Sequence, residues 1–462
     1  SPAWGAFAED SFKWKPNVTL QLGFRYDWNS TPSEADNRFV IFDPSADSLV
    51  QIGTNGFGQP FHTNNKNFQP RLGIVWDPFS NGRTIVRSGY AILTDQPVTG
   101  IVTGLNSNPP FTVPLIFGGP GTIALTSAIT QAGAAGLAPN ATNLQFDNPY
   151  VQSYNLNVEQ KLANTLGLTV AYVGSKGTHL RIARNLNQRI DGGVRPFPTL
   201  SASSPIDPGA KLGNITEIDS GGTSNYNALW VTLNKQTSHG FQFSASYTYS
   251  KSLDDNSLSS QGIILQDSND LRNNYGPSDF DVRNRFVISG FYELPFKDHR
   301  LTEGWQLGII SQAQSGSPLN LVTGVSGFTG TTGGGSLRPD AVGPTSVTGN
   351  PLQWFVSPTS FIVPCTDSKV PSTCHFGDLG RNAISGPDFV NTDFSIVKNT
   401  KISERFNLQF RTEFFDIFNH ANFGNPNLTI TSPFFGKITS TRFPTGDFGS
   451  SRQIQFALKL QF

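Results

Sequence analysis

The feature that most limits what this chain can fold into is a strict alternation of apolar and polar residues within long segments. Between Val18 and Trp28, every even position is apolar or aromatic, while the odd positions carry Thr, Gln, Gly, Arg and Asp. The same alternation runs through residues 241–249, 406–411 and 453–462. A side-chain period of two is typical of a β-strand with one apolar and one polar face. The chain is therefore predicted to be rich in amphipathic strands.

Thirteen segments follow this pattern, and most hold ten or more residues. Soluble sheets use strands of about five or six residues, whereas a tilted strand needs about 9 to 11 residues to cross the hydrocarbon of a membrane. The segment lengths therefore favour strands that span a bilayer. The segments are residues 4–14, 18–28, 68–78, 84–95, 151–162, 166–178, 227–237, 240–254, 282–296, 304–318, 389–401, 405–419 and 452–462.

The connections between these segments alternate in length. Short turns such as residues 15–17 and 80–82 are rich in Pro, Asn and Gly, and long loops lie between them. Short turns at one rim and long loops at the other are the layout of an outer-membrane β-barrel, whose turns are periplasmic and whose loops are extracellular. The long connections are residues 29–67, 96–150, 179–226, 255–281, 319–388 and 420–451.

The direction of the chain through the membrane follows from this alternation. If the last strand ends in the periplasm, every long loop lies outside and every short turn inside, provided that residues 435–441 belong to the last outer loop. Thirteen is an odd number, whereas bacterial single-chain barrels have even numbers of strands. Residues 1–462 are therefore predicted to be the C-terminal portion of a larger antiparallel transmembrane barrel. A soluble β-sandwich or propeller is the alternative, which strand length and loop alternation disfavour.

Composition excludes several other classes of protein. The 46 Gly and 31 Pro disfavour a helical bundle. Charged residues make up only 14% of the chain, well under the roughly 25% of an ordinary soluble domain. The 33 basic and 33 acidic residues balance, which disfavours a nucleic-acid partner. No apolar run approaches the ~18 residues of a membrane-spanning helix, so any crossing must be made by strands.

No catalytic or cofactor site is indicated by the sequence. The six His are scattered, and the zinc-protease, serine-hydrolase, phosphate-loop and CxxC motifs are absent, so we expect neither enzyme activity nor a cofactor. Cys365 and Cys374 lie in a loop rich in Pro, Ser and Thr, where a disulfide is the simplest interpretation. A metal site that includes His375 is the rival interpretation, although the spacing does not match that of zinc sites.

A cluster of charges stands at the head of one predicted strand and consists of Asp279, Asp281, Arg283 and Arg285. It is either a rim of salt bridges or a group that faces a ligand at the mouth of the lumen. Exposed rim pairs contribute little stability.

Nine stretches of the chain carry a family resemblance. They are LQLGFRYD (20–27), RLGIVWDP (71–78), NPYVQSYNLNVEQKL (148–162), VAYVGSKGTHL (170–180), NYNALWVTL (225–233), FSASYTYSKSLDD (243–255), GWQLGIISQAQSGSPL (304–319), FGDLGRNAISGPDF (376–389) and FNLQFRTEFFDIFNHANFGNPN (406–427). Together these stretches resemble the barrel of Oar-like TonB-dependent transporters. The last residues look like the signal that the barrel-assembly machinery recognises, and its apolar positions are Ile454, Phe456, Leu458, Leu460 and Phe462.

The resemblance implies a barrel of about 22 strands whose lumen is closed by a plug. It also implies energy supplied by the TonB complex of the inner membrane through a short N-terminal box. The chain departs from that pattern, because we find no plug, TonB box or regulatory domain within it. Thirteen strands alone would leave two unpaired edges in lipid, which is costly. We therefore expect further strands, or a partner, to complete the barrel.

The expected function is that of an outer-membrane transport or receptor barrel that takes up or moves a ligand. Its partners would be outer-membrane lipid, the TonB complex, the barrel-assembly machinery and that ligand. The polar side chains expected to line the lumen are Gln21, Arg25, Arg285, Gln409, Arg411 and Glu413. The exposed loop aromatics expected to capture the ligand are Phe111, Phe117, Trp354 and Phe361. The alternatives are a surface structural or adhesive protein that assembles by pairing strand edges, and a passive unplugged pore.

Overall fold

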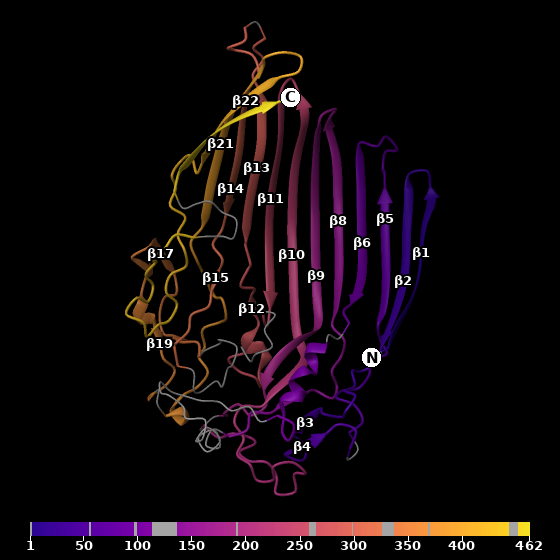
Figure 1. Cartoon of the computed structure of the whole chain (residues 1–462), viewed down its shortest axis with the longest axis vertical. Coiled ribbons are helices and arrows are strands. Elements are labelled where there is room, and N and C mark those ends of the chain that lie inside the picture. Colours follow the sequence, from indigo (N-terminus) through magenta and orange to yellow (C-terminus); the bar gives the residue numbers. More distant parts are fainter. Residues whose placement is uncertain are drawn as a thin grey trace.

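One large β-sheet dominates the computed structural model of the chain (Figure 1). The structure describes residues 2–54, 57–96, 99–112, 136–190, 193–257, 265–297, 299–325, 337–367, 370–442 and 451–462. Thirteen strands follow one another in a single antiparallel path, and two short strands, β7 (Asn140–Thr142) and β12 (Gly276–Pro277), bring the sheet to fifteen. The all-β antiparallel fold is therefore confirmed. No helix in the described ranges is long and apolar enough to cross a membrane.

We call the thirteen strands of this path the wall. Each predicted segment is one strand of the wall, and strands adjacent along the path are hydrogen-bonded neighbours. The strands are β1 (Ala3–Lys15), β2 (Val18–Asn29), β5 (Phe68–Trp76), β6 (Thr84–Thr94), β8 (Tyr150–Ala163), β9 (Leu166–Asn185), β10 (Thr216–Ser238), β11 (Phe241–Asp254), β13 (Asn284–Glu293), β14 (Trp305–Gln314), β21 (Phe389–Lys401), β22 (Asn407–Phe415) and β23 (Gln453–Gln461).

Short turns and long loops lie at opposite ends of the wall. Figure 1 shows the C-terminus at the turn end and the N-terminus toward the loop end. The turn between β10 and β11 illustrates why the short connections are tight. His239 and Gly240 have φ angles of 53° and 76°, the two positive values that a two-residue type I′ hairpin needs. The predicted alternation of turns and loops is thus confirmed.

The strand register separates two faces of the wall. Gln21, Gly73, Gly89 and Asn155 form one row across β2, β5, β6 and β8. The next row begins with Leu22 and continues through Leu72, Tyr90 and Tyr154, and these side chains point to the other face. One face is polar and the other is apolar, and on the apolar face Leu22 and Leu72 are 51% and 54% exposed.

Aromatic residues mark the two borders of the apolar face. On β1, Trp4 and Trp14 are ten residues apart on that face and are largely exposed. Ten residues correspond to ~33 Å along a strand, or to ~25 Å across a membrane for a tilt of about 40°. Near Trp4, the rings of Tyr26 and Phe68 lie in contact at a tilt of 40°, with centroids 5.1 Å apart. The spacing matches the height of the apolar band of an outer-membrane barrel.

Strands β9 and β10 are longer than predicted. They hold 20 and 23 residues and extend toward the loops as far as Asn185 and back to Thr216. The sequence analysis assigned residues 179–226 to a loop, which is wrong for the parts of this range that are strand. Loops cover both faces of the extensions, and Ile182 and Ile218, which lie on opposite faces, are only 2% and 7% exposed. Burial on both faces removes the alternation by which the other strands were found.

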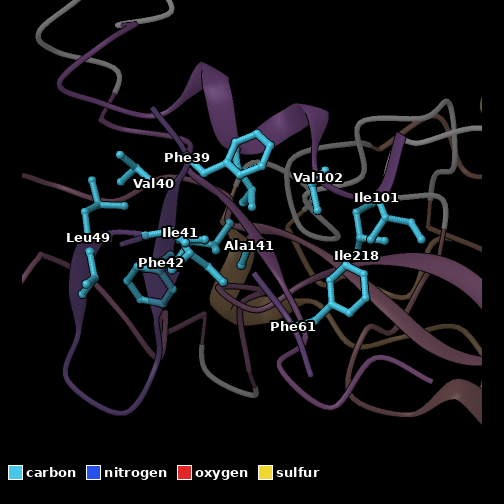
Figure 2. Packing of buried hydrophobic residues seen from close by; sticks show 14 of the residues in the cluster. Phe39, Val40, Ile41, Phe42, Leu49, Phe61, Ile101, Val102, Ala141 and Ile218 are labelled. Carbon is cyan, nitrogen blue, oxygen red and sulfur yellow. The ribbon is translucent and has the colours of Figure 1, made fainter. Parts of the chain in front are cut away.

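The long connections gather around the loop end of the wall (Figure 1). We call the described parts of residues 30–67, 95–149, 179–223, 255–283, 315–388 and 416–452 the cap, and we count the loop-end extensions of β9 and β10 (residues 179–185 and 216–223) with the cap and not with the wall. The cap has hydrophobic cores of its own. The first core joins the first three loops and includes Val40, Phe42 and Leu49 (Figure 2). The second core joins residues 319–384 and 423–438 around Phe355.

Small sheets and single turns of helix complete the cap. The paired strands are β3 (Val40–Asp43) with β4 (Ser48–Gln51), β15 (Pro318–Leu319) with β20 (Ile384–Ser385), β16 (Asp340–Ala341) with β19 (Phe361–Ile362), and β17 (Val347–Asn350) with β18 (Gln353–Phe355). The 3₁₀ turns are Thr99–Ile101, Thr103–Ser107, Leu271–Asn274, Pro358–Ser360 and Pro371–Thr373.

The wall is an open sheet. Among the residues that the structure describes, β1 and β23 each pair with one strand only. All thirteen residues of β1 are exposed. The two edge strands run in the same direction, from the loop end to the turn end, because an odd number of antiparallel strands lies on the path.

Candidate translocation surface

The polar face of the wall holds all six residues that were predicted to line a lumen. The row of Gln21 passes through Asn155, Val173 and Ala228 to Ser250 on β11. From β11 the same face continues through β13, β14 and β21 to β22. The six residues that share it are Gln21 and Arg25 on β2, Arg285 on β13, and Gln409, Arg411 and Glu413 on β22.

The apolar positions of the C-terminal strand point to the opposite face. Phe456 and Leu458 are 68% and 69% exposed, and Leu458 lies beside Phe410 of β22. The remaining members of this set are Ile454, Leu460 and Phe462, all at least half exposed. That these five residues act as a barrel-assembly signal stays a prediction.

A groove crosses the polar face between β2 and β8, and we call it the glycine groove. Its floor is formed by Gly23, Gly73 and Gly89. A Cβ on Gly73 would lie 3.0 Å from Oε1 of Gln21, and one on Gly89 would lie 3.3 Å from Nδ2 of Asn155. Larger side chains would therefore fill the groove. Polar side chains flank it, and they are Glu9, Gln21, Arg71, Arg87 and Asn155.

Three ion pairs lie on the polar face of the wall. The guanidinium of Arg25 lies 2.7 Å from the Asp27 carboxylate, which also accepts a hydrogen bond of 2.5 Å from Nε2 of Gln69. Arg411 and Glu413 pair at 2.7 Å on β22, and Arg87 pairs with Glu159 across β6 and β8. The arginines are between a third and a half exposed, so each pair contributes at most about 1 kcal/mol. The three pairs lie on a polar surface that water reaches.

The two acids of the charged cluster at the head of β13 make structural contacts. Asp281 is 6% exposed and accepts a hydrogen bond of 2.7 Å from the backbone N–H of Ser252. Asp279 accepts hydrogen bonds from Asn382 at 2.6 Å and from Arg381 at 3.4 Å. The one ion pair that the described residues form with this cluster joins Asp279 to Arg381, which lies outside it. Both interpretations of the cluster therefore stay predictions.

Two buried arginines in the cap were not singled out by the sequence analysis. Arg381 donates to the backbone oxygens of Asn274 and Asp254 at 2.9 and 2.6 Å and also pairs with the Asp254 carboxylate. It lies within the stretch FGDLGRNAISGPDF, so the resemblance offered a signal for it. Arg338 donates to the carbonyl of Leu379 at 2.8 Å, and burial lowers its pKa to about 10. No sequence pattern marks Arg338.

Gln266 joins three loops of the cap. Its Nε2 donates to the carbonyl of Gly377 at 3.0 Å, and its Oε1 accepts from the backbone N–H of Arg338 at 2.6 Å. Its own carbonyl accepts from Nε2 of Gln188 at 2.7 Å. Because Gln266 is 1% exposed, these bonds form away from water, where an unpaired amide is costly. The cap is therefore a connected layer.

Two of the aromatics expected to be exposed on the outer loops are buried. Trp354 and Phe361 are 6% and 5% exposed and belong to the second core of the cap. The expectation of exposure is wrong for both, because the loops fold on each other and bury their own apolar side chains. Phe111 is 44% exposed, while Phe117 lies outside the described residues. Capture of a ligand by these aromatics is untested.

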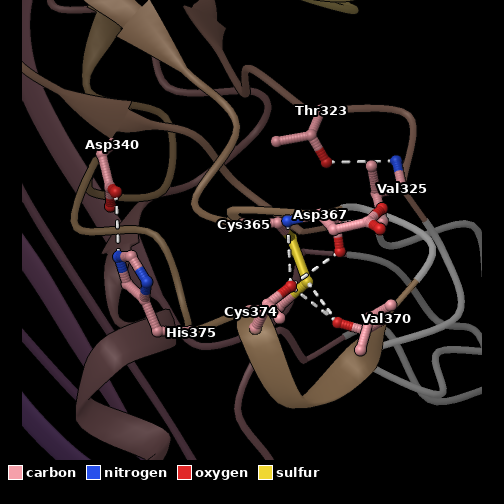
Figure 3. Close-up of a disulfide and its surroundings, with 9 residues drawn as sticks. Thr323, Val325, Asp340, Cys365, Asp367, Val370, Cys374 and His375 are labelled. Atoms are coloured by element: carbon pink, nitrogen blue, oxygen red, sulfur yellow. Dashed lines mark hydrogen bonds and ion pairs between the residues drawn. A yellow bond between two sulfur atoms is a disulfide. The ribbon is translucent and has the colours of Figure 1, made fainter.

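The two cysteines are joined in the structure by a disulfide between Cys365 and Cys374 (Figure 3). The neighbouring His375 points away from the sulfurs, and its Nε2 lies 2.9 Å from a carboxylate oxygen of Asp340 (Figure 3). Within the described parts of the chain, no three His, Cys, Asp or Glu side chains gather as a metal site would require.

Comparison with known proteins shows which family and which solved structures this chain is similar to. The model of a family described as "Outer membrane beta barrel domain" matches residues 1–455. No curated protein matches the sequence. The solved outer membrane transporter YddB from Escherichia coli is 12% identical with a TM-score of 0.51, and the match covers 99% of this chain and 44% of YddB.

Two further solved structures are similar at a lower score. The pyoverdine outer membrane receptor FpvA from Pseudomonas aeruginosa PAO1 is 11% identical with a TM-score of 0.47, and the match covers 100% of this chain and 42% of that one. The siderophore receptor PirA from Acinetobacter baumannii is 10% identical with a TM-score of 0.48, at 99% and 45% coverage. The chain thus spans less than half the length of these proteins.

Proposed function

Because this chain belongs to the outer membrane beta barrel domain family and its place is the outer membrane, we propose that it forms the C-terminal wall of an Oar-like TonB-dependent transporter. In this proposal the complete protein takes up or moves a ligand, and this chain performs no covalent chemistry. The observation that carries the proposal is the two-sided wall, with an apolar face for lipid and a continuous polar face for a lumen. Residues 1–462 are then one part of the barrel.

The polar face supports a lumen in which a ligand can move. Some of its charges are paired, as Arg411 with Glu413 and Arg25 with Asp27, and each pair attracts a passing solute less than a single charge would. The glycine groove adds a wet depression lined by Arg71 and Arg87. In this proposal Gln21, Arg25, Arg285, Gln409, Arg411 and Glu413 line the lumen.

The direction of the edge strands argues against assembly from copies of this chain alone. Copies in one membrane share an orientation, and both β1 and β23 run from the loop end to the turn end. Joining β23 of one copy to β1 of another would therefore need a parallel pair, whereas every pair in the wall is antiparallel. Antiparallel closure needs an odd number of additional strands. Strands from the same polypeptide meet that requirement, and this favours a larger barrel over an adhesive array.

The cap supports a receptor role at the loop end. In the proposal it forms a folded vestibule, and Phe111 offers an exposed aromatic surface there. TonB would act on a plug supplied by another part of the complete protein. The names of FpvA and PirA refer to pyoverdine and siderophores, and a siderophore is one candidate ligand for this protein.

The experiment that tests transport uses the full-length polypeptide in a planar lipid bilayer with potassium chloride as the conducting salt. The proposal predicts a channel that is closed at rest, together with binding of the isolated periplasmic domain of TonB to the full-length protein. Steady ionic current at rest would contradict it and identify a passive pore. Absence of TonB binding would contradict the energised mechanism.

A further inference from the structure

An acidic side chain lies near the middle of the apolar face. Asp10 of β1 is directly opposite Leu22 of β2, in a row that faces lipid. It is six residues from Trp4 and four from Trp14, which mark the two borders of the apolar face on β1. Four residues of a strand tilted by about 40° cover about 10 Å of membrane depth. Asp10 therefore lies well inside the hydrocarbon.

The other charges of this face are placed differently. Among the described strands of the wall, Asp10 is the only acidic residue whose register puts it on the apolar face. Lysines of this face lie within three residues of the end of the wall part of their strands, where a long side chain can reach the interface. They include Lys176, Lys235, Lys251 and Lys398. Asp10 has a short side chain and is five residues from the nearer end of β1, so it cannot reach water in the same way.

The described neighbours of Asp10 on this face are all apolar. They are Ala8 and Phe12 along β1, and Leu20, Leu22 and Phe24 on β2. No ion pair joins Asp10 to any residue in the described ranges. The remaining side of Asp10 is the free edge of β1, where no described strand is paired. The carboxylate and the open edge therefore need a partner on the same side.

We propose that the strand that joins β1 at this edge carries a lysine or arginine on its lipid-facing side, opposite Asp10 or two residues from that position, and that the two side chains form an ion pair within the membrane. The inference rests on the proposed function, because that function requires additional strands of the same polypeptide. A lone carboxylate in hydrocarbon is costly, and charged side chains at that depth pair with one another.

The ion pair would also specify how the barrel closes. A slip of one residue in the register of the joining strand would move its cation to the polar face and leave Asp10 in hydrocarbon. Only one register therefore satisfies both charges. Asp10 would select the partner strand of β1 and its alignment at the same time.

The first measurement identifies what lies at the free edge. The photoreactive residue p-benzoylphenylalanine replaces Asp10 in the full-length protein folded into phospholipid vesicles, and mass spectrometry identifies the cross-linked peptides. The proposal predicts a cross-link to a strand outside residues 1–462, with a lysine or arginine within two residues of the cross-linked position. Leu72 of β5 is the control position, because described strands lie on both sides of it, and its label should react only with those strands and with lipid.

The outcomes of this measurement separate the inference from the proposed function. Cross-links from position 10 to lipid alone would contradict both the ion pair and the completion of the barrel at β1. A partner strand of the same polypeptide with no lysine or arginine at these positions would overturn the inference and leave the proposed function standing.

The second measurement tests the charge through urea titration of folding into vesicles. Asp10→Leu should reduce the equilibrium constant for folding about 30-fold or more, because it leaves the partner cation alone in hydrocarbon. If Asp10 had no partner, the same substitution would favour folding. Glu9→Leu, one residue away on the polar face, is the matched control and should change the constant far less.

Exchange of the two charges completes the test. Asp10→Lys alone should impair folding, which heat-dependent mobility on gels reports, and substitution of the partner cation by Asp in the same chain should restore it. Improved folding of Asp10→Leu would overturn the proposal. So would failure of the double exchange to restore folding.

Discussion

The wall and the cap of this molecule use apolar residues in opposite ways. In the wall, large apolar side chains such as Phe456 are mostly exposed, at 68%. In the cap, Phe42 and Phe355 are 1% and 0% exposed. A soluble protein would have to hide the first kind, while lipid accepts them without cost. The wall is therefore built for a hydrocarbon solvent, and the cap for water.

The two regions are also stabilised differently. Antiparallel ladders between neighbouring strands link the wall from β1 to β23. The cap depends on two hydrophobic cores and on buried polar groups such as Arg381 and Gln266. Damage to a buried contact should therefore affect the cap locally, whereas damage to the lipid-facing surface should affect insertion of the wall.

Removal of a ring from the cap should have the largest effect. Phe355→Ala deletes a fully buried side chain that stacks on Phe435 at 4.8 Å, and should destabilise the cap by about 3–5 kcal/mol. Phe410→Ala on the apolar face of the wall is the matched control, and its effect should be much smaller because lipid replaces the lost contacts. Hydrogen exchange of the protein in bilayers measures both. Equal effects would contradict the comparison.

A charge placed on the apolar face should have the second-largest effect. Leu458→Arg lies near the middle of β23 on that face and should cost about 2–4 kcal/mol of folding free energy in lipid. Ala457→Arg, one residue away on the polar face, should cost far less. Urea titration of folding into phospholipid vesicles compares the two variants, and a larger penalty for Ala457→Arg would show that the faces are assigned the wrong way round.

The disulfide should matter for the cap alone. Opening the bond between Cys365 and Cys374 by substitution of both with Ser should cost about 2–3 kcal/mol, as expected for a loop of about ten residues. Proteolysis within residues 337–388 should become faster, while the heat-dependent mobility of the wall on gels stays unchanged. Loss of that mobility would show that the two regions are not separable.

A pH dependence should be the smallest effect, and it too belongs to the cap. Burial raises the pKa of Glu217, and also that of Asp255. A raised pKa in the folded state means that stability is complete below the ordinary carboxyl pKa, about 4, and declines as pH rises through the raised value. Glu217→Gln should reduce this decline in a pH series of cap unfolding.

Glu34 provides a control of opposite sign. Hydrogen bonds from the backbone and side chain of Arg38 lower its pKa, so its contribution is present above the ordinary pKa and is lost as pH falls. Glu34→Gln should therefore reduce the loss of cap stability that occurs as pH falls. A steeper decline at rising pH in Glu217→Gln than in the wild type would contradict the assignment.

The wall could be predicted from the sequence because each of its strands meets lipid on one face and water on the other. This condition requires apolar and polar residues to alternate, as they do from Leu20 to Tyr26. The alternation identified all thirteen strands. The extensions of β9 and β10 escaped because the cap buries both of their faces, as at Ile182 and Ile218.

The cap could not be predicted in the same way. Trp354 and Phe361 stand in stretches without a period, and only their contacts with residues far along the chain, such as Phe435 beside Phe361 at 5.9 Å, make them core residues. Arg338 and Gln266 are likewise defined by partners distant in sequence. The polar face was more accessible to prediction, because one correct register assigns every residue of a strand to a side.

The most direct measurement is site-directed spin labelling along β2 in a lipid bilayer, with oxygen and an aqueous nickel chelate as the two relaxing agents. Labels at Leu20, Leu22 and Phe24 should respond to oxygen, and labels at Gln21, Gly23 and Arg25 should respond to the chelate, with a period of two along the strand. A uniform response, or greater access of the chelate to the even positions, would contradict the two-sided wall.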